Sequence, residues 1–188
     1  MNNITTVILA AGRSTRFISS KSKLIQELAG YPIISHVFDS AKKISENIVV
    51  VCNMDNYQEL KNILIGCKFV IQKNQKGTAD AIEVAKQHIK TENFIILFGD
   101  VPLITDKSLK KLIRSFKKNN TGSMIAFETH RPKGYGRVVL NNNKVTKVVE
   151  EINASHDEKL IEFCNSGIML VKKSIFYKNI KLIKFNKK

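Results

Sequence analysis

The feature that most limits the fold of this chain is a regular alternation of short apolar runs with longer amphipathic segments. The short runs are rich in β-branched residues, which favour strands, and the longer segments repeat apolar residues at helical spacing. Strands are predicted at Thr5–Ala10, Ile48–Cys52, Lys68–Ile71 and Phe94–Phe98, and helices at Ile33–Ile44, Tyr57–Ile65, Ala79–Ile89 and Ser108–Lys117. This order predicts an α/β fold with a mostly parallel sheet and helices on both faces.

After Gly122 the pattern changes to strands with few helices between them. These later strands are predicted at Ser123–Glu128, Arg137–Leu140, Lys144–Glu151 and Gly167–Val171. Three consecutive asparagines, residues 141 to 143, indicate a hairpin turn between two of them. We expect these strands to extend the sheet and close over a ligand.

Length and composition indicate one domain that fills residues 1–188, because 188 residues with 43% hydrophobic content can bury a sizeable core. The apolar runs are too short to span a membrane, and the amino terminus lacks the features of a signal peptide. We therefore expect a cytoplasmic protein without a membrane partner. Cys52, Cys67 and Cys164 are odd in number and widely spaced, so we expect buried or half-buried thiols rather than disulfides or a metal site.

The formal net charge of +15 is compatible with a nucleic-acid partner. Lysine is, however, abundant along the whole chain rather than gathered in one block, which is typical of solvated faces. We expect no nucleic-acid partner. A basic surface would favour small anionic substrates such as nucleotides and sugar phosphates.

The clearest motif runs from Val7 to Phe17, where an apolar strand meets a turn of small residues followed by two arginines. Backbone N–H groups and guanidinium groups at the carboxyl end of a strand suit the phosphates of a nucleoside triphosphate. The segment matches neither G-x-x-x-x-G-K-[ST] nor G-x-G-x-x-G. Taken alone, it is equally compatible with an ordinary turn after a buried strand.

Further polar groups lie where predicted strands end. Gln72 precedes a Gly-Thr turn that enters a helix, and Asp100 follows a buried strand as a natural Mg²⁺ ligand. A last group interrupts the later strands: Gly134 to Arg137, Glu150-Glu151 and Asn165 to Gly167. Each alone is compatible with a strand exit or a bend. Their shared place at strand ends favours a binding site.

Together these motifs closely resemble the uridylyltransferase domain of bacterial bifunctional N-acetylglucosamine-1-phosphate uridyltransferases, from about Thr6 to Val171. The matching segments are Leu9-Ala10-Ala11-Gly12, Thr15-Arg16, Lys23, Gln72, Gln75-x-Gly77-Thr78-Ala79, Gly99 to Leu103, Gly134-Tyr135-Gly136-Arg137, Val149-Glu150-Glu151 and Asn165 to Ile168. The resemblance implies a Rossmann-like nucleotidyltransferase fold. It also implies that UTP and N-acetylglucosamine 1-phosphate are joined to UDP-N-acetylglucosamine and pyrophosphate, a step that feeds cell-wall (peptidoglycan) synthesis.

The resemblance also implies roles for individual residues. The uridine would be held by Leu9, Ala10, Ala11, Gly12, Gln72, Gly77 and Thr78. Arg16 and Lys23 would contact phosphates, Asp100 would bind Mg²⁺, and Gly136, Glu150 and Asn165 would contact the amino sugar or the neighbouring ribose. The attacking phosphate monoester, with a second pKa of about 6, is largely dianionic at neutral pH, so no general base is required. His36, His88, His130 and His156 are accordingly expected to be structural or exposed.

The chain departs from this family at several positions. Ser14 and Ser22 stand where the family has glycine and proline, and Ile152-Asn153 where it has a charged pair. The family continues beyond residue 188 with an asparagine as a second metal ligand and an acetyltransferase domain. We therefore expect a domain truncated at its carboxyl end, without acetyltransferase activity. Alternatives are a nucleotidyltransferase for another substrate, a weakly active nucleotide-binding remnant, and, last, a nucleic-acid-binding module.

Overall fold

The computed structural model describes residues 4–12, 22–116, 120–180 and 182. It divides into two compact units, the first formed by Met1–Ser123 with Leu170–Lys188 and the second by Met124–Met169. The strands β7 (Gly122–Glu128) and β10 (Phe163–Lys172) pass from one unit into the other. Each unit is described by itself below, and the single domain predicted from length stays a prediction.

The first unit contains a parallel sheet in the order β5-β4-β1-β6. Its strands are β1 (Ile4–Leu9), β4 (Asn47–Cys52), β5 (Lys68–Ile71) and β6 (Asn93–Phe98). Their registers pair Val7 with Val49 and Ile96, so β1 lies in the middle of the sheet. Both neighbours of β1 run parallel to it, so the carboxyl ends of these strands meet at one edge.

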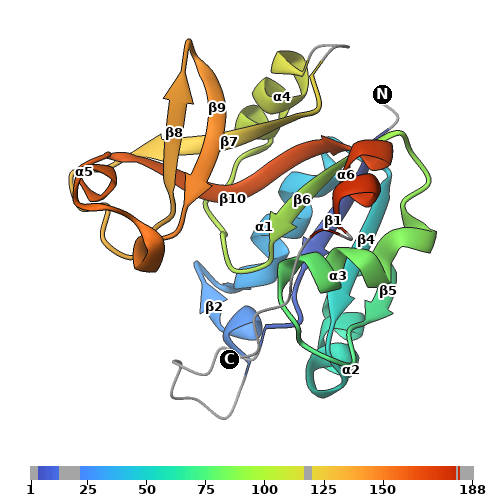
Figure 1. Ribbon diagram of the computed structural model, residues 1–188. Coiled ribbons are helices and arrows are strands. Elements are labelled where there is room, and N and C mark those ends of the chain that lie inside the picture. The colour runs from blue at the N-terminus through green and yellow to red at the C-terminus, as the bar shows by residue number, and fades with distance from the viewer. Residues whose placement is uncertain (1–3, 13–21, 117–119, 181, 183–188) are drawn as a thin grey trace. The chain divides into compact units, whose positions relative to one another are not determined.

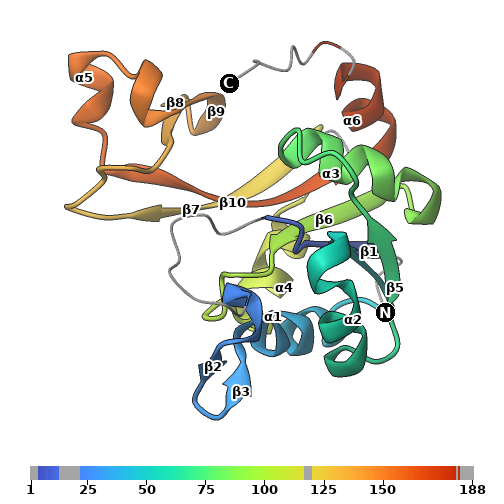
Figure 2. The same cartoon turned by 90° about the horizontal axis from the view of Figure 1, so that it is seen from below.

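Helices cover both faces of this sheet (Figure 2). They are α1 (Ile33–Lys42), α2 (Met54–Ile63) and α4 (Asp106–Ser115) on one face, and α3 (Thr78–Ala85) with α6 (Lys173–Ile180) on the other. Short elements complete the unit: the 3₁₀ helices η1 (Lys23–Ile25) and η2 (Lys86–His88), and a small antiparallel pair, β2 (Glu27–Leu28) with β3 (Tyr31–Pro32). The predicted α/β class, with a mostly parallel sheet and helices on both faces, is confirmed.

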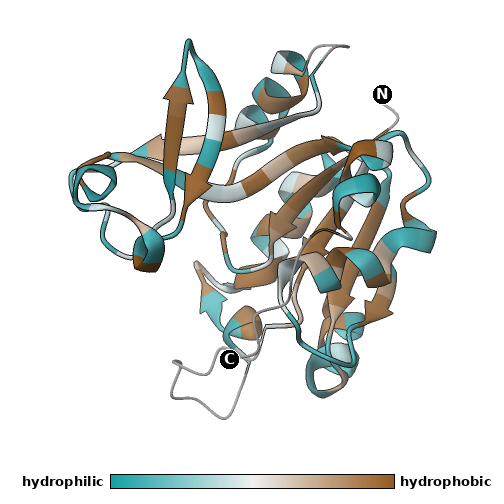
Figure 3. Cartoon of the chain, in the orientation of Figure 1, coloured by the Kyte–Doolittle hydropathy of each residue, from teal (hydrophilic) through white to brown (hydrophobic). Residues whose placement is uncertain are grey.

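The core of the first unit is formed by strands that are apolar on both sides, as expected for a sheet covered by helices on both faces. Val7, Ile8, Val50, Ile95 and Ile96 are fully buried. Figure 3 shows the strands of this sheet as mostly brown, whereas the helices also carry teal stretches. No helix in the described part of the chain is long and apolar enough to cross a membrane.

The second unit is built on the hairpin of β8 (Arg137–Asn141) and β9 (Lys144–Val149) (Figure 1). Asn142 and Asn143 in its turn have φ values of 48° and 58°, which the polar side chain of asparagine tolerates, and the predicted hairpin turn is confirmed. β10 pairs antiparallel with β8 and also pairs with β7. Two short helices, η3 (Glu151–Asn153) and α5 (His156–Lys159), lie between β9 and β10.

The cysteines are free thiols: Cys52 and Cys164 are buried and Cys67 is half-buried, as predicted. Burial raises the pKa of Cys52 and of Cys67 to about 11, so both thiols stay protonated at neutral pH.

Candidate nucleotide-binding site

A cavity of about 350 Å³ lies in the first unit, where β1, β5 and β6 end. Most of the predicted nucleotide and metal residues line it: Leu9, Ala10, Ala11, Gly12, Gln72, Gly77, Thr78 and Asp100. Leu24, Gln75, Ala81 and Phe98 complete the lining. Strand ends that lie far apart in the sequence are therefore brought together at the edge of the sheet where ligands bind in α/β folds.

The loop after β1 is held by two asparagines of α2. Asn53 Nδ2 donates to Ala11 O at 3.0 Å, and Asn56 Nδ2 donates to Ala10 O at 2.7 Å. The N–H that follows each of these carbonyls points the opposite way, since the peptide bonds are trans. Both asparagines therefore turn the N–H groups of Ala11 and Gly12 away from α2. In the described part of the chain these two N–H groups donate no hydrogen bond, so they are available to a ligand in the cavity.

Asn53 and Asn56 also begin α2. Asn53 is its N-cap, and the two side chains each accept a hydrogen bond from the other residue's backbone N–H, which forms a capping box. Sequence reasoning missed both residues as part of the site. The signal was present as asparagines three residues apart just after a strand, which indicates a cap. Only the fold shows that their amide groups also reach the β1 loop.

Gln72 follows β5 and is 4% exposed. Its Nε2 donates to Asp80 Oδ2 at 2.6 Å and to Gly77 O at 3.3 Å. Gly77 is the N-cap of α3 with a φ of 109°, a conformation that favours glycine. Gln72, which was predicted to contact a base, is therefore held in place by the start of α3.

Asp100 follows Gly99 at the end of β6, and its Oδ2 lies 3.0 Å from Lys23 Nζ on η1. The structure thus places the predicted metal ligand next to the predicted phosphate contact. Ser22, which stands where the family has proline, is the N-cap of η1 and accepts a hydrogen bond from the Leu24 N–H at 3.4 Å. The serine therefore supports the turn that carries Lys23.

The donor set of the cavity suits Mg²⁺ bound together with a nucleotide. Asp100 is the acidic residue among the lining residues, and the described residues contain no group of three or more histidine, cysteine or acidic side chains that could hold a metal. Mg²⁺ commonly takes one or two carboxylates and completes its octahedral shell with phosphate oxygens and water. Asp100 fits that role once phosphates are present.

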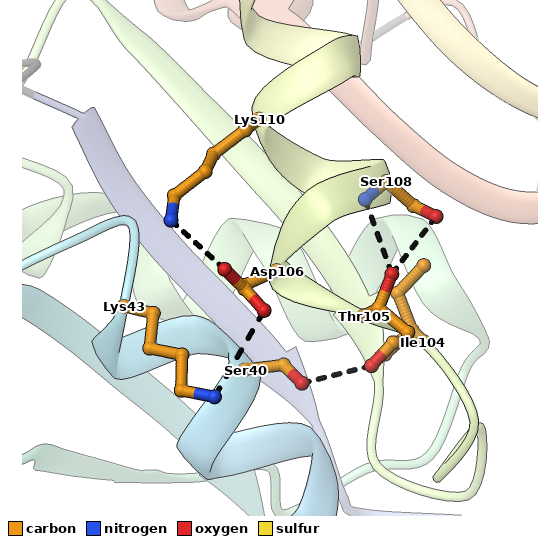
Figure 4. A network of polar contacts seen from close by, with 7 residues as sticks. All are labelled: Ser40, Lys43, Ile104, Thr105, Asp106, Ser108 and Lys110. Carbon is orange, nitrogen blue, oxygen red and sulfur yellow. Dashed lines mark hydrogen bonds and ion pairs between the residues drawn. The ribbon is translucent and has the colours of Figure 1, made fainter.

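Asp106, six residues after Asp100, is engaged elsewhere (Figure 4). It lies in the first turn of α4, with its carboxylate 2.8 Å from Lys110 Nζ and 3.9 Å from Lys43 Nζ. The hydrogen bond from Lys110 is the main reason why the pKa of Asp106 lies below its usual value. Ser40 Oγ donates to Ile104 O beside it, so this network joins α1 to the start of α4.

The predicted sugar-contacting residues form a separate cluster in the second unit. Asn165 N–H donates to Gly136 O at 2.8 Å, and a Cβ added to Gly136 would lie 3.2 Å from Glu150 Oε1. Asn165 Oδ1 accepts a hydrogen bond from the Gly167 N–H at 2.7 Å, within β10. Gly136, Glu150 and Asn165 are therefore neighbours, and their contact with a sugar stays a prediction.

Arg137 lies next to Gly136 in the sequence and is buried, with 1% of its surface exposed. Its Nη2 lies 2.7 Å from Glu151 Oε2, and its guanidinium also donates to Tyr135 O and Lys159 O. Glu151 accepts a further hydrogen bond from the Gly134 N–H. The Arg137 hydrogen bond, followed by that of Gly134, holds the pKa of Glu151 below its usual range.

Arg16, predicted to contact phosphate, lies outside the described residues. Among the described residues, no histidine is part of the cavity lining. His36 Nε2 is 2.8 Å from Leu28 O, and His130 is an exposed side chain that pairs with Glu162. His88 ends η2 and His156 begins α5.

Solved structures share this fold. An inositol-1-phosphate CTP transferase from T. maritima superposes with a TM-score of 0.80 at 16% identity, over 98% of this chain and 76% of that one. A putative glucose-1-phosphate thymidylyltransferase from Bacillus anthracis gives 0.79 at 17% identity, over 96% and 76%. These similarities show the fold of the chain, which is an α/β Rossmann-like fold.

The sequence comparison is more specific. Residues 6–166 match the MobA-like NTP transferase domain, and the chain belongs to this nucleotidyltransferase family. Curated relatives include the bifunctional protein GlmU of Campylobacter fetus subsp. fetus (strain 82-40), 38% identical over 98% of this chain. GlmU of Buchnera aphidicola subsp. Schizaphis graminum (strain Sg) is 37% identical over 89% of it. The chain spans 43% and 37% of the lengths of these two relatives. The predicted family is thereby confirmed.

Proposed function

We propose that this chain is a Mg²⁺-dependent uridylyltransferase that joins UTP and N-acetylglucosamine 1-phosphate, giving UDP-N-acetylglucosamine and pyrophosphate. The observation that carries the proposal is the cavity at the ends of β1, β5 and β6. There free N–H groups, a buried side-chain amide, a carboxylate and an ammonium group meet. The relatives named GlmU support this particular reaction.

Each group in the cavity has a task that its chemistry allows. The N–H groups of Ala11 and Gly12 would donate to the nucleotide, and Gln72 would face its base. Lys23 would neutralise a phosphate oxygen. When bound, Mg²⁺ would be held by Asp100 and phosphate oxygens and would reduce the repulsion between the two anionic substrates.

The reaction needs alignment and charge neutralisation rather than proton transfer. The phosphate monoester of the sugar, with a second pKa of about 6, is already largely dianionic at neutral pH. Backbone N–H groups, Lys23 and a Mg²⁺ ion held in part by Asp100 would therefore supply what the reaction needs without a general base. Gly136, Glu150 and Asn165 would bind the sugar part.

The direct test is Mg²⁺-dependent release of pyrophosphate by the purified chain. UTP with N-acetylglucosamine 1-phosphate is compared with CTP and with glucose 1-phosphate, each replacing one substrate. We expect turnover with the first pair to exceed that of both replacements. Turnover with another pair would assign a different nucleotidyltransferase reaction, and tight UTP binding without turnover would indicate a nucleotide-binding remnant.

A further inference from the structure

The side-chain amide of Gln72 is held in one orientation by two hydrogen-bond acceptors. Its Nε2 carries two hydrogens, and one acceptor lies near each: Asp80 Oδ2 at 2.6 Å and Gly77 O at 3.3 Å. A carbonyl and an ionised carboxylate only accept hydrogen bonds. If the amide were flipped, Oε1 would face both acceptors and two contacts would become repulsive. The nitrogen therefore stays on the side of Asp80.

The oxygen of the same amide is the part that remains for a ligand. In the described part of the chain, Gln72 Oε1 has no hydrogen-bond partner. Among the described residues, three side-chain polar atoms are both fully buried and without a partner: Thr6 Oγ1, Asn93 Oδ1 and Arg137 Nε. Gln72 Oε1 is not one of them, so this unpartnered oxygen is not fully buried. Gln72 lines the cavity, so this oxygen is the side-chain polar atom of Gln72 that is left to a ligand bound there.

We infer that Asp80 is the positioning residue that sets base specificity, by making Gln72 present a hydrogen-bond acceptor and no donor. This inference rests on the proposed function, in which Gln72 faces the base. Uracil has a ring N–H at position 3 that can donate to Oε1. Cytosine has an unprotonated ring nitrogen at that position, which would face the oxygen with a second lone pair. A contact between Oε1 and ring position 3 therefore favours UTP over CTP.

Asp80 has this effect without contacting the nucleotide. It lies in the first turn of α3, is half-buried, and is not part of the cavity lining. Asp80→Asn keeps the size of the side chain and adds a group that can donate. The asparagine Nδ2 could then donate to Oε1 of a turned Gln72 amide, and only the longer 3.3 Å contact with Gly77 O would still oppose the turn that presents Nε2 to the cavity.

The test measures equilibrium dissociation constants of UTP and CTP by titration calorimetry, so it does not depend on turnover. The control is Glu83→Gln, which removes the same charge from the same helix; Glu83 pairs with Lys86. We expect wild-type chain and control to prefer UTP at least about tenfold, and Asp80→Asn to lose that preference by about tenfold. A matching melting temperature checks that the variant is folded.

The outcomes separate the inference from the function on which it rests. If wild-type chain prefers UTP and Asp80→Asn keeps the preference, Asp80 does not position Gln72 and the inference fails alone. If Glu83→Gln loses the preference as well, the charge of α3 is responsible and the inference also fails. If wild-type chain binds CTP as tightly as UTP, the proposed uridine specificity is itself wrong.

Discussion

At Gly99, just after β6, the backbone passes so close to its neighbours that an added methyl group would press on them. An added Cβ would lie 3.2 Å from Leu9 O, 3.3 Å from Leu24 Cδ2 and 3.4 Å from Ile34 Cδ1. The Gly99 N–H also donates to Leu9 O at 2.9 Å, which ties the end of β6 to the end of β1. Gly99 thus sets the position of Asp100 relative to the β1 loop.

Gly99→Ala is therefore expected to lower the free energy of unfolding by about 1–3 kcal/mol, because the methyl group forces backbone and side chains apart. Denaturant unfolding measures the change. Gly12→Ala is the matched control, since a Cβ there meets no atom of the described residues within 4 Å. Equal stability of the two variants would show that the residues around Gly99 can shift to accept a methyl group at no cost in stability.

Asp100→Asn is expected to reduce Mg²⁺-dependent turnover at least about 100-fold, because the variant loses the charge that would hold the metal. Stability should change little, since Asp100 and Lys23 are both partly exposed and such pairs contribute little. Asp106→Asn, the same change in the network of Figure 4, is the control. Turnover that keeps its wild-type magnesium dependence in Asp100→Asn would remove this carboxylate from the site.

At the scale of elements, the start of α2 links a helix cap to the ligand loop. Asn53 accepts a hydrogen bond at the helix end and donates another to Ala11 O. The strands of the parallel sheet followed closely from the sequence, and β5 was predicted at its observed bounds. The helices α5 and α6 and the β2–β3 pair were not predicted. The β10 strand was predicted too short, because Asn165 and Gly167 read as a break although the strand continues through them from Phe163.

The variant Asn53→Ser separates the two roles of Asn53, which caps α2 and donates a hydrogen bond to Ala11 O. Serine also caps helices well but has no group to donate to Ala11 O. We expect a loss of stability of about 1 kcal/mol for the missing hydrogen bond and a clearly weaker affinity for UTP, measured by calorimetry. Asn53→Ala, which also removes the cap, should be less stable than Asn53→Ser. Wild-type affinity in Asn53→Ser would mean that the β1 loop is oriented by other contacts.

The Arg137–Glu151 pair gives the second unit a defined pH dependence. A lowered pKa in the folded state means that the carboxylate stabilises the fold fully above the ordinary glutamate value of about 4.3, and less as the pH falls through the lower folded value. The difference in unfolding free energy between wild-type chain and Glu151→Gln should be constant near neutral pH and shrink below about pH 4.3. Denaturant titrations across this range test it. A difference that does not change on acidification would contradict the assignment.

At the scale of the whole molecule, the predicted site residues fall into two sets. Those for the nucleotide and the metal lie in the first unit, and Gly136, Glu150 and Asn165 lie in the second. Of the first set, Asp100 contributes a single carboxylate and pairs with Lys23. The bound nucleotide would therefore have to supply most ligands of the metal.

We accordingly expect no measurable binding of millimolar Mg²⁺ to the nucleotide-free chain, and clear binding once UTP is present. Titration calorimetry with and without UTP is the measurement. Asp100→Asn should weaken the binding seen with UTP. Metal binding to the free chain would reveal a second protein ligand, and Glu150→Gln would then show whether Glu150 supplies it.

The sequence by itself determined the α/β class, the strands of the parallel sheet and most of the cavity lining, because periodicity is local and strand ends of a parallel sheet meet at one edge. Only the tertiary structure decided which side chains touch there. Lys23 meets Asp100, Asn53 and Asn56 hold the β1 loop, and Asp80 orients Gln72. The first two arise between segments more than 40 residues apart in the sequence. The third depends on how Gly77 turns the chain into α3. Such contacts are set by packing in three dimensions, which local sequence patterns do not encode.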